Sequence, residues 1–358
     1  PVSVRKTDRL LEALICLQTT EKSFYDLGQF PCQRGRYRRA EDNTIFFSSL
    51  IALTLKGIQE HIKPELTLRV DSICNYVIRN YENYQNKSGL KTYNFWKTNP
   101  PVFFPNSILL SHCSAFHVPD DADCTSIIYL TDTSLTQHAA WLQTKFTEHA
   151  NQSKLQIKNA FRAYRNFKAY STWFGKKMPI EFDICVQANV LYFIYKNGLP
   201  LTVQDKDCLA LIREQIRSGD YLKYAYYLSP SYKKKAIVLY HLSRLLEKNT
   251  IPLLEDCRET VKTDIEKELS KSTSYMDSII LSTALTRMGG HPPVSIKTNP
   301  SDPSLENYVF FRANLFSSYA RPSLRFISKM NLFERKFYCK AYCLALLAEY
   351  EAVCSQKK

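Results

Sequence analysis

Three aspartates lie within four residues of one another and lead directly into an apolar segment. The stretch reads Pro119-Asp-Asp-Ala-Asp-Cys-Thr-Ser-Ile-Ile-Tyr-Leu, which places carboxyl groups at Asp120, Asp121 and Asp123. A free aspartic acid has a pKa near ~3.9, so it keeps a proton at neutral pH only if burial or a neighbouring negative charge opposes ionisation. Clustered carboxyls that face a cavity would meet both conditions. The cluster is therefore a candidate for general-acid catalysis.

The same aspartates also suit a structural role at the start of a helix. Aspartate at the N-cap or in the first turn accepts free backbone N–H groups and interacts favourably with the helix dipole. Asp42, Asp183 and Asp277 stand at the start of other apolar segments in the same way. For these three we expect capping. For the cluster at 120–123 both interpretations stay open.

Aromatic residues form a second candidate feature, because the chain has 23 tyrosines and 20 phenylalanines but only nine glycines. Aromatic ring faces stabilise positive charge, so a cavity lined with them suits a carbocation. Core packing is the ordinary role of any single ring. The candidate substrate-binding rings are Trp96, Phe103, Phe104, Tyr192, Phe193, Tyr226, Tyr227 and Phe311.

The elements that must position these residues are predicted to be helices. Six segments, which begin near 42, 122, 183, 231, 275 and 337, are apolar around the whole helical circumference. A helix of this kind is covered by neighbours on all sides. Between them lie amphipathic stretches at 65–83, 135–150, 204–218 and 252–269, and looser stretches at 84–106, 171–180 and 289–306. The alternation predicts an all-α, (α/α)₆ toroid of about twelve helices in one domain, residues 1–358.

The cluster and several of these segments resemble a known family. Asp-Asp-Ala-Asp-Cys-Thr-Ser is similar to the Asp-X-Asp-Asp-Thr-Ala motif of class II terpene cyclases, the squalene-hopene cyclase group. Asn94-Phe-Trp, Asp183-Ile-Cys-Val-Gln-Ala-Asn-Val-Leu and Tyr226-Tyr-Leu-Ser-Pro look like segments of bacterial proteins with prenyltransferase and squalene-cyclase repeats. The resemblance extends over residues 5 to 352, in short motifs, and implies a terpenoid-cyclase-like toroid.

The resemblance also implies roles for individual residues. Asp121 and Asp123 match the first two aspartates of the motif, whereas Cys124 stands in place of the third. In that family the middle aspartate protonates an alkene, so the resemblance implies Asp123 as the proton donor, with Asp121 and Asp120 in support. The implied substrate is an apolar isoprenoid, with or without a diphosphate group. Full-length cyclases of this class use two helical domains, and here we expect one.

A metal site is a further interpretation of the same region. Protein prenyltransferases, which share the fold, bind zinc through aspartate, cysteine and histidine, and His112, Cys113 and His117 precede the cluster. Adjacent His112 and Cys113 do not form a regular chelating pair, and the Asp-X-Cys spacing is absent. We therefore assign no metal ligands and do not expect zinc. Three carboxylates could still hold Mg²⁺ against a diphosphate.

Two functions of different classes follow from these observations. The first is an isoprenoid cyclase with its substrate in a central aromatic cavity. The second is a non-catalytic toroid that binds a lipid, a peptide or a protein partner. A deep cavity with Asp123 at its floor favours the enzyme, and a centre filled by side chains favours the binding protein. Because (α/α)₆ barrels also host sugar chemistry, Glu181 and Asp183 are the carboxylate pair to test for that activity.

Composition narrows the class of partner. The net charge of +14 attracts anions, so peripheral contact with an acidic membrane stays open. Zinc-finger spacing and RNP-type motifs are absent from the sequence, so nucleic acid is not an expected partner. The eleven cysteines, among them Cys16, Cys74, Cys185 and Cys343, predict buried free thiols in a reducing cytoplasm. No apolar run is long enough to predict a membrane-spanning helix.

Overall fold

The computed structural model describes residues 2–101, 118–175, 178–314, 317–319, 321–329 and 334–354. These residues are mostly helical. The helices are α1 (Val2–Ile15), α2 (Phe46–Gly57), α3 (Pro64–Ile78), α4 (Ala122–Thr131), α5 (Ala139–Glu148), α6 (Ile184–Lys196), α7 (Val203–Arg217), α8 (Asp220–Lys223), α9 (Ala225–Leu228), α10 (Lys235–Glu247), α11 (Arg258–Lys271), α12 (Tyr275–Arg287) and α13 (Lys340–Cys354). The strands are β1 (Cys32–Gly35), β2 (Arg39–Asp42), β3 (Val309–Asn314) and β4 (Glu334–Tyr338).

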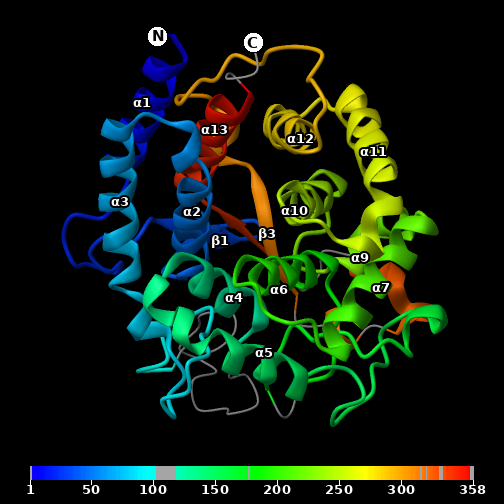
Figure 1. Cartoon of the computed structure of the whole chain (residues 1–358). Coiled ribbons are helices and arrows are strands. Elements are labelled where there is room, and N and C mark those ends of the chain that lie inside the picture. The colour runs from blue at the N-terminus through cyan, green and yellow to red at the C-terminus, as the bar shows by residue number, and fades with distance from the viewer. Residues whose placement is uncertain are drawn as a thin grey trace.

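Six of these helices pack side by side around the middle of the molecule (Figure 1). In order, α2 contacts α4, α4 contacts α6, α6 contacts α10, α10 contacts α12, α12 contacts α13, and α13 returns to α2. These are the six apolar segments of the sequence. The largest difference from a predicted start is four residues, at α2, which begins at Phe46 instead of near 42, and at α10, which begins at Lys235 instead of near 231. The positions of the inner helices are thus confirmed.

Burial separates these inner helices from the outer ones. The inner helix α2 is buried at every position from Phe46 to Leu55, and α10 at every position from Ala236 to Leu246. The outer helix α3 buries positions 66, 70, 73, 74 and 77, which is one face of a helix. On α11 only Val261 and Ile265 are buried. The predicted amphipathic stretches therefore correspond to α3, α5, α7 and α11.

The predicted helix caps are confirmed only in part. Asp183 is the N-cap of α6, and its carboxylate accepts the backbone N–H two residues further on at 2.9 Å. At α12 the capping side chain is Ser274, whereas Asp277 lies inside the first turn. Asp42 lies ahead of α2 at the end of β2, where it accepts the indole N–H of Trp96 at 2.8 Å. The capping assignment of Asp42 was therefore wrong, whereas Asp277 occupies the first turn, where an acidic side chain also suits the start of a helix.

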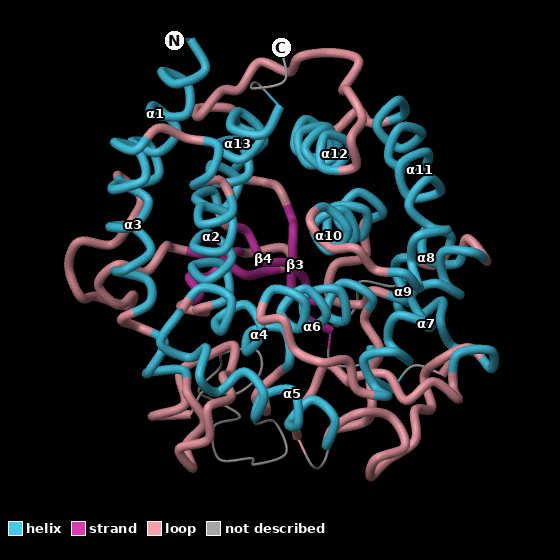
Figure 2. Tube along the Cα trace, viewed as in Figure 1, coloured by secondary structure: helices cyan, strands magenta, loops and turns pink. Residues whose placement is uncertain are grey.

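The chain also contains an antiparallel sheet, so the all-α prediction was wrong in this part. Its strand order is β2-β1-β4-β3. Figure 2 shows the strands in the middle of the outline that the helices form. The first and last parts of the chain meet there, because Gln33 on β1 pairs with Tyr338 on β4. The predicted inner segments near 42 and 337 in fact begin with strand residues, and α2 and α13 follow them.

Aromatic side chains fill the space between the sheet and the inner helices. The ring centroid of Phe311 on β3 lies 4.5 Å from that of Phe46 on α2 and 5.3 Å from that of Phe95. Phe310 lies 4.8 Å from Tyr342 on α13. One cluster of buried apolar side chains runs from Leu10 to Ala352. Much of the centre of the helical circuit is therefore packed, and β3 supplies rings to it.

Ten of the eleven cysteines fall within the described residues, and all ten are free thiols. Cys74, Cys185 and Cys343 are buried as predicted, but Cys16, just after α1, is exposed. Within the described residues, no helix has both the length and the apolar character needed to cross a membrane.

Candidate active site

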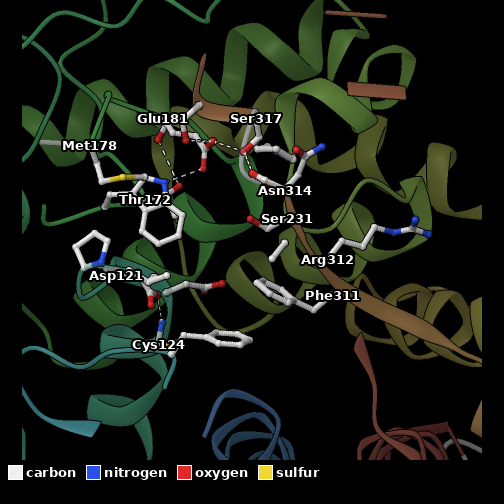
Figure 3. Close-up of a pocket in the computed structure, with 18 of the residues that line it drawn as sticks. Asp121, Cys124, Thr172, Met178, Glu181, Ser231, Phe311, Arg312, Asn314 and Ser317 are labelled. Atoms are coloured by element: carbon white, nitrogen blue, oxygen red, sulfur yellow. Dashed lines mark hydrogen bonds between the residues drawn. The ribbon is translucent and has the colours of Figure 1, made fainter. Parts of the chain in front are cut away.

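A pocket lies where the N-terminal ends of several inner helices meet (Figure 3). Phe46 begins α2, Asp121 is the N-cap of α4, Glu181 precedes α6, and Ser231 precedes α10. Strand β3 closes another side with Phe311 and the three residues after it. The space inside these walls is about 1010 Å³ when its open mouth is included.

Aromatic rings form much of the pocket wall. They are Phe46, Phe95, Trp96, Trp173, Phe311 and Tyr319. Of the rings predicted to bind substrate, Trp96 and Phe311 are therefore at the pocket. Four others lie elsewhere, on α6 and α9: Tyr192, Phe193, Tyr226 and Tyr227. Phe103 and Phe104 lie outside the described residues.

Asp121 combines the two roles that the sequence left open. Its carboxylate caps α4 by accepting the backbone N–H of Cys124 at 2.7 Å, and it also lines the pocket. Burial, followed by the negative charge of Asp123, raises the pKa of Asp121 to about 8. The side chain is 5% exposed. Asp121 therefore carries a proton at neutral pH while it still caps the helix.

Asp123 lines the same pocket but is held by donors in the helical wall. Its carboxylate accepts the amide N–H of Asn189 at 2.6 Å and the hydroxyl of Tyr232. Arg244 in turn donates to the amide oxygen of Asn189. Burial raises the pKa of Asp123, and these donors together with the charge of Arg244 oppose the rise. Both carboxylate oxygens of Asp123 are thus occupied by protein groups.

Asp120 is not among the residues that line the pocket. Its carboxylate accepts from Asn86 at 2.5 Å and from Thr92 at 2.6 Å. The three aspartates of the cluster therefore do not converge on one point. Within the described ranges, no group of three or more His, Cys, Asp or Glu side chains is arranged to hold a metal ion. The proposed Mg²⁺ site formed by all three carboxylates is therefore wrong, and His112, Cys113 and His117 lie outside the described residues.

A third carboxylate, Glu181, lies in the pocket wall. Figure 3 shows Glu181 and Ser317 on one side of the pocket and Asp121 on the other. Glu181 accepts from Trp173 Nε1 at 3.2 Å, from Ser317 Oγ at 2.8 Å and from Ser318 Oγ at 2.5 Å. Burial raises the pKa of Glu181, although these donors oppose the rise. From the sequence, Glu181 was a candidate only as the partner of Asp183 in sugar chemistry. Its place in the pocket wall with Asp121 was not predicted, because its partners Ser317 and Ser318 lie far along the chain.

The sugar-chemistry pair is not assembled in this pocket. Asp183 caps α6 and accepts from Ser229 Oγ at 2.8 Å and from the backbone N–H of Ser231 at 3.0 Å. It is not one of the described lining residues. Glu181 instead shares the pocket with Asp121 and Asp123.

The chain matches no protein-family model, no curated protein and no solved structure.

Proposed function

We propose that the chain is an (α/α)₆ toroid of the terpenoid-cyclase type that protonates an apolar, isoprenoid-type substrate. The proposal is supported by the closed order of contacts among α2, α4, α6, α10, α12 and α13 and by the pocket at their N-terminal ends. One observation carries the catalytic part. Asp121 is a buried carboxyl with a pKa of about 8, and it lines a pocket with aromatic walls.

In this proposal Asp121 is the proton donor, in place of Asp123. The proton passes from the Asp121 carboxyl to one carbon of a substrate double bond, whose π electrons form the new C–H bond. The neighbouring carbon becomes a cation, which the ring faces of Trp96 and Phe311 stabilise. A second double bond attacks this cation to close a ring, and loss of a proton to a carboxylate ends the reaction. Asp123 is a positioning residue, since its charge helps to keep Asp121 protonated.

The test is product formation from farnesyl, geranylgeranyl and squalene chains, followed by mass spectrometry. Asp121→Asn removes the acidic proton but retains the cap, because asparagine is an equally good N-cap residue. We expect product to fall by about 10²- to 10⁴-fold, the usual contribution of a general acid. Asp183→Asn makes the same exchange at the N-cap of α6, outside the pocket, and should keep its activity.

Asp123→Asn separates this assignment from the one that the family resemblance implies. If Asp121 donates, Asp123→Asn lowers the rate less than Asp121→Asn does. If Asp123 donates, the order of the two effects reverses. Full activity in Asp121→Asn, or no cyclic product from any of these chains with the unmodified protein, removes the proposal.

A non-catalytic binding role is the second candidate, and the packed centre favours it. The rings of Phe46, Phe95 and Phe311 lie 4.5–5.5 Å apart and occupy space that a long substrate would need. A binding protein would retain a lipid or peptide unchanged through purification. Extraction and mass spectrometry of the purified protein would detect such a ligand, and a chemically unaltered ligand with no turnover would favour this role.

A further inference from the structure

The pocket has an excess of acidic over basic side chains. Asp121, Asp123 and Glu181 line it, and among the described lining residues the one basic side chain is Arg312. The Nη1 atom of Arg312 lies 2.5 Å from an oxygen of Glu334, which is fully buried. Arg312 is thus held by an acid that does not line the pocket, and it shares that acid with Lys233.

Among the residues that the structure describes, Glu181 has only neutral partners. Its partners Trp173, Ser317 and Ser318 are neutral donors, and no positive charge in the described part of the chain contributes to its pKa. Asp121 holds a proton near neutral pH, and Asp123 feels the charge of Arg244. A carboxylate that is only 1% exposed is costly without a counter-ion. Within the described residues Glu181 hydrogen-bonds only to neutral donors, so a cation bound beside it would lower the cost of ionising this carboxyl.

The walls of the pocket also suit a cation, and one of its rings, Trp173, is in contact with Glu181. The rings of Trp96, Trp173 and Phe311 line the pocket, and aromatic faces attract positive and repel negative charge. A carboxylate has about four lone-pair positions, and three of those on Glu181 already accept hydrogen bonds. Glu181 thus has little capacity left for several N–H donors. A cationic ligand that carries alkyl groups in place of N–H groups would instead place those alkyl groups against the aromatic rings.

We propose that this pocket binds an alkylated ammonium ion on an apolar body, with Glu181 as its counter-ion and the aromatic walls around it. The inference rests on the pocket of the proposed function but not on its reaction, since a permanently charged ligand takes no proton from Asp121. A diphosphate group is excluded from the pocket by the same charges. An isoprenoid diphosphate would therefore have to keep its head group outside.

A matched pair of small probes tests the charge preference. Phenyltrimethylammonium and tert-butylbenzene have nearly the same shape and differ in charge, and phenylphosphonate supplies the anion. Tryptophan fluorescence reports binding, because Trp96 and Trp173 line the pocket. The third tryptophan, Trp141 on α5, is 37% exposed, and a Trp141→Phe background removes its signal. We expect the cation to bind at least about tenfold more tightly than the neutral probe, with phenylphosphonate weakest.

The same titrations in two variants assign the preference to one residue. Glu181→Gln removes the charge with little change in size, and the preference for the cation should fall to about one. Glu255→Gln makes the same change on a side chain that is 64% exposed and outside the pocket, and should leave the preference intact. Circular dichroism establishes that each variant is folded.

Several outcomes overturn the inference. The inference is wrong if the unmodified protein binds the cation and the neutral probe with equal affinity, even if the variants do not fold. Tightest binding of phenylphosphonate, or a cation preference that survives in Glu181→Gln, also overturns it. Cation preference without cyclic products removes the proposed function alone. Cyclic products without cation preference remove this inference alone.

Discussion

Two buried glutamates, Glu334 and Glu181, show how differently the molecule treats nearly equal burial. Glu334, the first residue of β4, is fully buried and accepts from Lys233 Nζ and Arg312 Nη1, each at 2.5 Å. Glu181 is almost as buried, but its partners are neutral donors from a tryptophan and two serines. Glu334 therefore has its own counter-ions, whereas the described partners of Glu181 are all neutral.

The pKa values of the two carboxyls move in opposite directions for this reason. Burial alone would raise both. At Glu334 the charges of Lys233 and Arg312 outweigh burial, so its pKa is lowered. At Glu181 burial prevails and the pKa is raised. Glu334, Lys233 and Arg312 thus form an ion cluster that links β4, the segment before α10 and β3. Glu181 lies at the pocket and has neutral partners among the described residues.

The largest expected effect on stability comes from Glu334, the glutamate that is paired with Lys233 and Arg312. Glu334→Gln leaves Lys233 and Arg312 without their shared counter-ion, although the Lys233 side chain is only 8% exposed. Breaking a buried pair of this kind costs about 3–5 kcal/mol of the free energy of unfolding. Urea denaturation at neutral pH measures it. A loss below about 1 kcal/mol would mean that the cluster contributes little to stability.

Asp121 gives the next largest effect, as a dependence of stability on pH. Its pKa rises from 3.8 in the unfolded chain to about 8 in the folded one. Between these values the folded state holds a proton that the unfolded state has lost, so stability falls as pH rises. Asp121→Asn removes this contribution. The free energy of unfolding of the variant, relative to the unmodified protein, should therefore increase by roughly 2–4 kcal/mol from pH 5 to pH 8.

Urea denaturation at several pH values between these limits measures that difference. Asp120→Asn is the control, because it exchanges a neighbouring aspartate that lies outside the pocket lining. Parallel stability curves for Asp121→Asn and the unmodified protein would show that Asp121 is ionised in the folded state. The assignment of Asp121 as proton donor would then lose its physical basis.

The sequence allowed prediction of the inner helices but not of the sheet. A segment such as α10, buried at every position from Ala236 to Leu246, is apolar on all sides, and this pattern is visible locally. The strands are four to six residues long and carry charged side chains. Their pairing joins positions such as Gln33 and Tyr338 at opposite ends of the chain. Such distant pairing leaves no periodic signal in a short segment.

The candidate site could be predicted only in outline. The spacing of Asp121 and Asp123 was enough to select a general-acid candidate, because both lie at the start of one helix. The difference between them depends on Asn189 and Tyr232, which other segments bring to Asp123. The environment of Glu181 is set by serines more than a hundred residues away, so only the folded chain reveals it.

A smaller effect is expected from the hydroxyl that supports Asp123. Tyr232→Phe removes a donor to a carboxylate that is 4% exposed, which should cost about 1–3 kcal/mol and raise the pKa of Asp123 further. Tyr308→Phe is the matched control, since Tyr308 donates to Asp277 at 2.8 Å, and Asp277 also pairs with Lys234. Urea denaturation at neutral pH should show a smaller loss for Tyr308→Phe. Equal losses of stability in the two variants would mean that the Lys234 counter-ion of Asp277 does not change the contribution of the tyrosine–aspartate hydrogen bond.

The smallest effect on stability is expected from Glu181, the second glutamate of the comparison. Glu181→Gln removes a buried charge whose described partners are all neutral, so the lost hydrogen-bond strength is offset by a lower desolvation cost. The serine hydroxyls of Ser317 and Ser318 can rotate to accept from the new amide group. We therefore expect the free energy of unfolding without ligand to change by no more than about 1 kcal/mol. A loss as large as that of Glu334→Gln would show that Glu181 also belongs to a structural cluster, and the contrast between the two regions would disappear.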